Sequence, residues 1–270
     1  MTKTTIKDVL ETLEKETGVS RDAPIRVRVF HLTWLAVPLA FYLAVEWAFN
    51  AFAPEMADGN ERLLAFEIVL FALLVPAPLL LRQSFTAGWR APHGFSWLWI
   101  AGPLWLGVLT PISAAHANYA AAPETIALYL AIAFFVAVNE ETIFRGFILR
   151  GMAKSFHPMI AVVASSLAFG ALHFLNIDAG GDPVFVGAQM VSAFGVGAIM
   201  AAMTLRSGST LPAILFHFLG DFVGLGAIGG YEQGIQSAEL APSLIISGLV
   251  FAAWGLFWSW RTVKSGKARL

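Results

Sequence analysis

Long apolar runs, each close to the length of a membrane-spanning helix, constrain the fold of this chain more than any other feature. The hydrocarbon core of a bilayer is about 30 Å thick, so a helix that crosses it needs about 20 consecutive apolar residues. Eight such runs occur, at residues 30–52, 63–81, 95–113, 124–149, 158–176, 184–205, 209–228 and 242–261. The sequence therefore predicts an all-α, polytopic membrane protein with about eight transmembrane helices in one bundle.

The composition agrees with lipid as the main solvent of the surface. Hydrophobic residues make up 57% of the chain and charged residues 13%, about half of the charged fraction usual in soluble domains. The net charge of −1 argues against nucleic acid as a partner. Because the chain has no cysteine, a disulfide framework and a thiolate zinc site are both excluded.

The charges between the runs predict the orientation of the chain in the membrane. With the N-terminus inside, the inner segments and adjoining span ends hold every Lys and Arg except Arg62, whereas outer loops carry acids such as Glu55, Asp58 and Asp178. This split follows the positive-inside rule, and an even number of spans then places both termini in the cytoplasm. The charged first 29 residues show no cleavable signal, so we expect the first span to be a signal anchor. From the topology and the composition we expect the plasma membrane of a bacterium.

Three parts follow from this reading of the chain. We expect a cytoplasmic amphipathic segment at residues 1–29, a transmembrane domain at residues 30–261 and a basic cytoplasmic tail at residues 262–270. In the first part, apolar residues between Ile6 and Leu13 recur at helical spacing, which predicts a short helix resting on the membrane or on the bundle.

Ionisable residues interrupt three of the predicted spans. Such residues are costly in a bilayer, so they usually face the bundle interior or a water-filled cavity, where they pair with one another. They are Glu140, Glu141 and Arg145 in the fourth span, His173 in the fifth, and His217 and Asp221 in the seventh. We expect these groups to meet in one intramembrane polar cavity.

Helical spacing predicts two contacts within single spans. Glu141 and Arg145 lie four residues apart, so their side chains can pair on one face of the helix. His217 and Asp221 have the same spacing, which would let the carboxylate accept a proton from one ring nitrogen and fix the tautomer of the imidazole.

Spacing also predicts a contact between two spans. Glu140 and His173 are equally far from the turn at residues 154–158, about 24 Å along each helix, so antiparallel neighbours can bring them to one level. A base, a group that orients it and donors for a developing oxyanion are the parts that water-driven acyl hydrolysis needs. We expect Asn139 and Asn176 to be structural and to hydrogen-bond this cluster.

Three short motifs on separate spans resemble those of one protein family. They read NEETIFRG from Asn139, AFGALHFLN from Ala168 and ILFHFLGDF from Ile214. In this order they are similar to the Glu-Glu-x3-Arg, Phe-x3-His and His-x3-Asn/Asp motifs of the CPBP intramembrane protease family, also called the Abi family. That family includes the Rce1-type CAAX prenyl endopeptidases. The resemblance covers about residues 124–228, the motif core of the transmembrane domain.

The resemblance implies a helical bundle around a polar cavity and an intramembrane endopeptidase that hydrolyses a peptide bond there. Glu140 and His173 would activate a water as general base. Glu141 would be steadied by Arg145 and would tune the charge of the site. Phe169 matches the aromatic position of the second motif and shares a helix face with the histidine that follows it.

The third motif implies that His217 and Asp221 bind or polarise the scissile carbonyl and stabilise its oxyanion. One departure affects this role, because the prenyl-protein proteases tend to have Asn where this chain has Asp221. A carboxylate cannot donate to an oxyanion unless it is protonated. The departure favours an orienting or metal-ligand role for Asp221.

The residues leave two chemistries open. A metal-free glutamate mechanism needs no cofactor, whereas a divalent metal such as Zn²⁺ would take two His and two or three carboxylates and keep one position open for water. The ligands of such a metal would be Glu140, His173, His217 and Asp221. The absence of an HExxH helix favours the metal-free form.

Two other functions compete with peptide hydrolysis. The chain could be a catalytically silent scaffold or a bacteriocin self-immunity protein, or, with less support, a proton-coupled transporter, since acid and His pairs also make proton relays. The substrate of a protease would be a membrane-associated protein or peptide. A prenylated CAAX protein is the substrate that the resemblance suggests for a host that prenylates proteins, whereas a bacterium would offer small membrane peptides.

Overall fold

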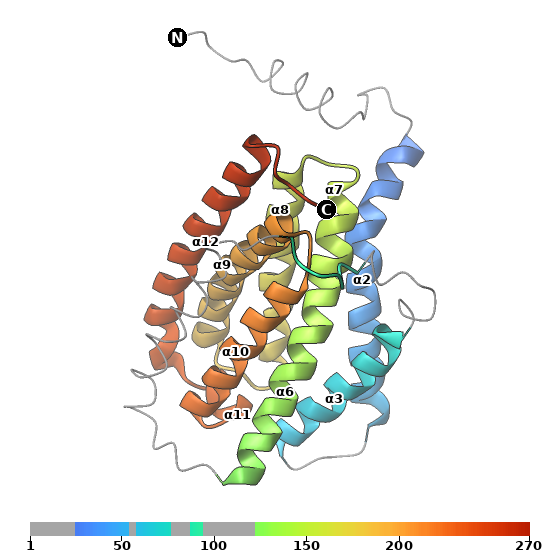
Figure 1. Ribbon diagram of the computed structural model, residues 1–270. Helices are drawn as coiled ribbons and strands as arrows, with labels where there is room; N and C mark the ends of the chain where they lie inside the picture. Colours follow the sequence, from blue (N-terminus) through green and yellow to red (C-terminus); the bar gives the residue numbers. More distant parts are fainter. Residues whose placement is uncertain (1–24, 54–57, 77–86, 94–121) are drawn as a thin grey trace.

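The computed structural model describes residues 25–53, 58–76, 87–93 and 122–270, with side chains from residue 32 onward (Figure 1). Every regular element within these residues is helical, which confirms the predicted all-α membrane bundle. The predicted third span and most of the predicted amphipathic segment lie outside the described residues.

Six of the described helices are long and apolar enough to cross a membrane, so the chain is a multi-pass membrane protein. They are α2 (Ile25–Phe52), α6 (Pro123–Glu141) with its continuation to Ala153, α8 (Pro158–Leu172), α9 (Pro183–Ser207), α10 (Leu211–Ile228) and α12 (Ala241–Lys264). These helices correspond to the first and the fourth to eighth predicted spans.

Helix α3 (Gly59–Leu74) corresponds to the second predicted span and has 16 residues. Its start is fixed by Asp58, whose carboxylate accepts hydrogen bonds from the backbone N–H groups of Asn60 and Glu61, at 2.8 and 3.1 Å. The prediction for residues 63–81 is confirmed as a helix up to Leu74, and residues 77–81 lie outside the described residues.

Helix α6 changes its winding near the middle of the bundle. It runs to Glu141, continues as a π-helical segment at Thr142–Leu149 and ends as the short α-helix α7 (Arg150–Ala153). A π-helix bonds each residue to the fifth one along instead of the fourth, and such segments are frequent at functional sites.

Helix α9 is the central packing helix of the bundle and lies between α8 and α12 (Figure 1). Small residues allow this close approach, because a Cβ at Gly195, Gly248 or Gly255 would overlap the backbone of the facing helix. This is the usual way in which membrane helices pack when no hydrophobic effect drives them together.

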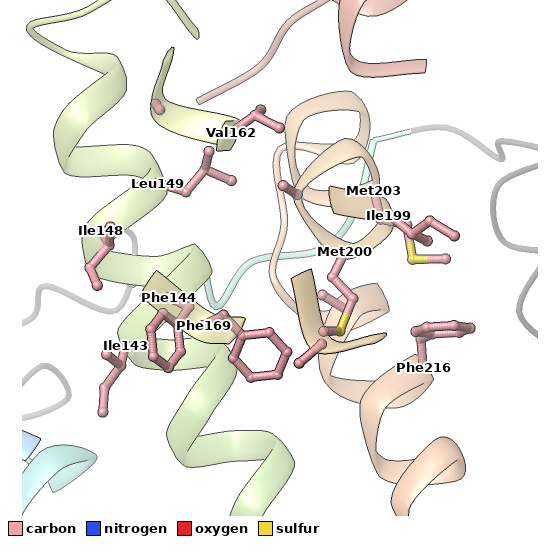
Figure 2. Close-up of a cluster of buried hydrophobic side chains, with 14 of the residues drawn as sticks. Ile143, Phe144, Ile148, Leu149, Val162, Phe169, Ile199, Met200, Met203 and Phe216 are labelled. Atoms are coloured by element: carbon pink, nitrogen blue, oxygen red, sulfur yellow. The ribbon is translucent and has the colours of Figure 1, made fainter. Parts of the chain in front are cut away.

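A cluster of buried apolar side chains joins the helices near the π-helical segment (Figure 2). Phe144 comes from that segment, Phe169 from α8, Met200 from α9 and Phe216 from α10. The cluster fixes the four elements to one another, and Phe169 is also part of the polar site described next.

Two short elements close the end of the bundle where α10 finishes. They are α11 (Tyr231–Ile235) and a 3₁₀ turn at Ala238–Leu240, which leads into α12. The opposite end is crossed by residues 87–93, where the backbone N–H of His93 donates to the carbonyl of Ser207 at 2.9 Å.

Candidate active site

The imidazole of His217 is the centre of a buried group of carboxylates. Its Nδ1 lies 3.0 Å from Glu141 Oε1, and its Nε2 lies 3.2 Å from Asp221 Oδ2 and 3.6 Å from Glu140 Oε2. His217, Glu140 and Glu141 are buried, whereas the Asp221 side chain is 34% exposed. Two helices, α6 and α10, therefore bring three acids to one ring.

The local winding of α6 explains how two consecutive acids face the same ring. Neighbouring residues on an α-helix point about 100° apart, so Glu140 and Glu141 flank α10 from two directions. They are the last two residues before the π-helical segment begins at Thr142. Helix α10 packs along α6, which places His217 between the two carboxylates.

Arg145 holds Glu141 in place. Its Nη1 donates to Glu141 Oε1 at 2.6 Å, the same oxygen that faces His217, and both side chains of this ion pair are fully buried. The guanidinium lies over the ring of Phe169, 4.4 Å from the ring centroid, and a Cβ at Gly197 would lie only 3.0 Å from its Nη2. The i,i+4 contact expected from the sequence is thus present and tightly enclosed.

His173 reaches the site through Phe169. Its Nδ1 lies 3.0 Å from the backbone carbonyl of Phe169, and since a carbonyl only accepts, Nδ1 must carry the proton. The other ring nitrogen, Nε2, is then the acceptor in the neutral ring. The Phe169 ring contacts both imidazoles edge-on, with centroid distances of 5.3 Å to His173 and 5.6 Å to His217.

The partner of Glu140 differs from the one expected from helix levels. Spacing along the chain predicted a contact with His173, whereas the nearest charged partner of Glu140 is His217. Among the residues that the structure describes, no direct ion pair or hydrogen bond joins Glu140 to His173. Equal distance from a turn sets the height of two side chains but says nothing about how the helices are rotated.

The described acids and histidines do not form a metal site. Within residues 25–53, 58–76, 87–93 and 122–270, no group of three or more His, Asp or Glu side chains is arranged so that it could hold an ion. The expected ligand set of Glu140, His173, His217 and Asp221 therefore does not fit a metal in this arrangement.

A third buried acid, Glu67 of α3, was missed by the reading of the sequence. It is 2% exposed and accepts a hydrogen bond from Asn139 Nδ2 at 2.7 Å, while the same amide group donates to the Glu67 backbone carbonyl at 2.8 Å. The signal was available, because a Glu inside an apolar run is costly and calls for a partner. Asn139 is thus structural, as expected, but its amide bonds Glu67 and not the cluster that the sequence predicted.

Asn176, the other residue expected to be structural, lies in a separate polar network. Its Nδ2 donates to Gln189 Oε1 at 2.8 Å, and its Oδ1 accepts from the Tyr231 hydroxyl at 2.9 Å. Burial, together with the charge of Glu46, raises the pKa of Tyr231 to about 12, so this hydroxyl stays a donor at neutral pH. The network joins the 3₁₀ turn at His173–Ile177, which follows α8, to α9 and α11. It therefore fixes the end of α8.

Comparison with known proteins agrees with the motifs. Residues 122–223 match the family model described as type II CAAX prenyl endopeptidase Rce1-like. This segment contains the residues around His217 and extends from α6 to α10, so the resemblance seen in the motifs is confirmed over it. No curated protein and no solved structure matches the chain.

Proposed function

We propose that the chain is an intramembrane endopeptidase that hydrolyses a peptide bond with a water activated by Glu140 and His173. The observation that carries this proposal is the gathering of Glu140, Glu141 and Asp221 around a single imidazole, within helices long enough to cross a membrane. The match of residues 122–223 to a family of CAAX-type endopeptidases supports the same activity.

Glu140 is the acid best suited to take a proton from the water. Its Oε2 lies 3.6 Å from the nearest ring nitrogen, so that oxygen is not tightly bound in the resting site. Glu141 is the poorer base, because its Oε1 is already held by Arg145 and faces His217 Nδ1. The Nε2 of His173 is an acceptor in the tautomer that its Nδ1 contact selects, so it can share the proton.

The proposed reaction balances with these groups alone. The water oxygen bonds to the carbonyl carbon while its proton moves to the carboxylate of Glu140. The carbonyl oxygen becomes an oxyanion, which is stabilised by sharing with Asp221 the proton on Nε2 of His217. When the carbon–nitrogen bond breaks, the proton on Glu140 passes to the leaving amine. The products are a new amino terminus and a carboxylic acid, which ionises by giving its remaining proton to the amine or to solvent.

Asp221 acts on the imidazole in this scheme rather than on the oxyanion. Its Oδ2 lies 3.2 Å from His217 Nε2, a distance at which an ionised carboxylate accepts the ring proton. Glu141 faces the opposite nitrogen at 3.0 Å. The two acids together fix the plane of the ring, and its Nε2 also lies 3.6 Å from Glu140 Oε2.

The substrate follows from the depth of the site. The acids lie in helices that cross the membrane, so the scissile bond must enter the bundle from the bilayer or from its surface. We therefore propose a membrane-associated protein or peptide as the substrate. The matching family is named for endopeptidases that act on prenylated CAAX proteins, so a protein with a lipid-modified C-terminal segment is the first substrate class to test.

The activity is tested with purified protein in liposomes, a library of membrane-anchored peptides and mass spectrometry of the products. We expect wild type to cleave and Glu140→Gln to lose about 100-fold or more of kcat, since general acid–base groups contribute roughly 10²–10⁴-fold. The matched control is Glu124→Gln, which removes an exposed acid from the first turn of the same helix and should cleave normally.

Other outcomes separate the competing functions. A scaffold or immunity protein would give no product from either form and would keep its phenotype in the Glu140→Gln variant. A proton-coupled transporter would show flux that the variant loses, again without a peptide product. Cleavage by Glu140→Gln at the wild-type rate would refute the proposed base.

A further inference from the structure

The carboxylate of Glu67 has no part in the reaction proposed above, yet it lies buried in a membrane protein. A buried carboxylate is costly unless it is hydrogen-bonded. Its side-chain contact is the 2.7 Å hydrogen bond from Asn139 Nδ2, and that amide also donates to the Glu67 backbone carbonyl at 2.8 Å. One amide group is thus held by both the side chain and the backbone of a single residue.

This contact sits directly beside the catalytic acids in the sequence. Asn139 immediately precedes Glu140, and consecutive helical residues point about 100° apart. With Asn139 fixed against α3, Glu140 and Glu141 are turned toward α10, where both face His217.

The winding of α6 makes such an anchor useful. At Thr142–Leu149 the helix is π-helical, so the α-helical hydrogen-bond pattern that sets the directions of the α6 side chains changes directly after Glu141. Beyond the acids, Arg145 holds Glu141, but Glu140 has only the 3.6 Å approach to His217. The bond of Asn139 to α3, one residue earlier and about 100° around the helix, restricts the rotation of the helix at Glu140.

We propose that Glu67 and Asn139 are positioning residues that set the orientation of Glu140 toward His217. Neither residue touches the substrate or the water. The proposal rests on the proposed endopeptidase function, in which Glu140 is the base. It assigns α3, which lies outside the matched residues 122–223, a direct part in arranging the site.

The test compares variants that keep or break the hydrogen bond. In Glu67→Gln the Oε1 of the new amide still accepts from Asn139, so kcat should stay within about threefold of wild type, because the hydrogen bond is kept. In Glu67→Leu the acceptor is lost, and kcat should fall about tenfold or more with little change in KM, because misplaced catalytic groups lose transition-state stabilisation. Glu61→Gln, an exposed acid of the same helix, is the matched control.

A rescue experiment keeps the proposal testable if Glu67→Leu fails to fold. Asn139→Asp sets two carboxylates against each other and should lower kcat about tenfold or more, since misaligned groups lose rate. Adding Glu67→Gln supplies an amide donor to Asp at position 139 and should restore most of the lost kcat. A purely structural role would instead change the amount of folded protein and leave kcat per folded molecule unchanged, and that result would overturn the proposal.

A signal independent of cleavage separates this proposal from the proposed function. With ¹⁵N-labelled histidine, the ring signals of His217 are identified by their loss in a His217→Gln variant. They should shift in Glu67→Leu and stay in place in Glu61→Gln. Wild type without any cleavage would refute the function alone, whereas unshifted His217 signals in a folded Glu67→Leu variant would refute the positioning pair.

Discussion

Helices α9 and α10 follow one another in the chain, yet they are built in opposite ways. Helix α9 is buried along most of its length between α8 and α12, and small apolar residues dominate it. Helix α10 has four buried residues, Pro212, Ala213, Phe216 and His217, and it packs mainly against α6. Close backbone packing is thus concentrated on α9, whereas the charges are concentrated where α6 meets α10.

Glycines show the same contrast. A Cβ at Gly195 of α9 would overlap the backbone carbonyl oxygen of Gly248, so only glycine fits that position. On α10, no atom of the described residues lies within 4 Å of a Cβ at Gly220 or Gly224. The comparison suggests that α9 supplies a rigid frame and that the α6–α10 contact is held by polar bonds.

The largest effect is expected from Arg145→Met. It leaves the fully buried carboxylate of Glu141 without its cation, and breaking a buried ion pair in this way costs about 3–5 kcal/mol. The loss of stability is measured on protein in detergent, as the shift of the unfolding transition that heat or denaturant induces. Arg261→Met, which removes an exposed arginine of α12, is the matched control and should change stability little.

A double variant shows whether the lost stability comes from the uncompensated charge. Glu141→Gln added to Arg145→Met removes that charge and should recover part of the free energy of unfolding, but cleavage should stay low because His217 loses an ionic partner. If Arg145→Met unfolds like wild type, then the α6–α10 contact does not depend on this ion pair.

Packing on α9 is tested by Gly195→Ala. The added methyl group would push α9 away from α12, and overpacking of this kind costs about 1–3 kcal/mol. Gly187→Ala lies on the same helix with no described atom within 4 Å of the new Cβ, so it should leave the unfolding transition unchanged. Equal stability of the two variants would contradict the assignment of α9 as the rigid frame.

The parts of this structure that sequence could predict are those set by local periodicity. The spans follow from the lengths of the apolar runs, and the Glu141–Arg145 and His217–Asp221 contacts follow from the four-residue spacing, which brings two side chains to one helix face. These predictions do not depend on how one helix is rotated against another, because each concerns a single helix.

The contacts between helices could not be predicted in the same way. The approach of Glu140 to His217 depends on the rotation of α6 and on the π-helical winding that follows it, and neither is visible in the pattern of apolar residues. The sequence could have predicted that Glu67 needs a partner, because a charge inside an apolar run is costly. It could not have predicted that the partner is Asn139, because the two residues are far apart in the chain. Side-chain contacts between different helices can be predicted only when the positions and rotations of the whole helices are known.

A smaller effect is expected when Asp221 is replaced. In Asp221→Asn the amide oxygen can still accept from Nε2 of His217, so cleavage should stay within about threefold of wild type, since this hydrogen bond is kept. Asp221→Leu removes the acceptor, and kcat should fall about tenfold, the rate equivalent of one net hydrogen bond of about 1.4 kcal/mol. Loss of activity in Asp221→Asn equal to that in Asp221→Leu would show that the charge, and not the orientation of the ring, is what the site needs.

The smallest effect is expected from removal of metal. Since the described acids and histidines form no group that could hold an ion, 1,10-phenanthroline or EDTA should leave the cleavage rate unchanged. A zinc peptidase treated in the same liposome buffer shows that the chelator works, because such an enzyme keeps its catalytic ion with only three protein ligands and loses activity when the ion is removed. Activity that the chelator abolishes and added Zn²⁺ restores would mean that the ligands move together when substrate or metal binds. The polar contact between α6 and α10 would then be the adaptable part of the bundle, in still sharper contrast to the close-packed α9.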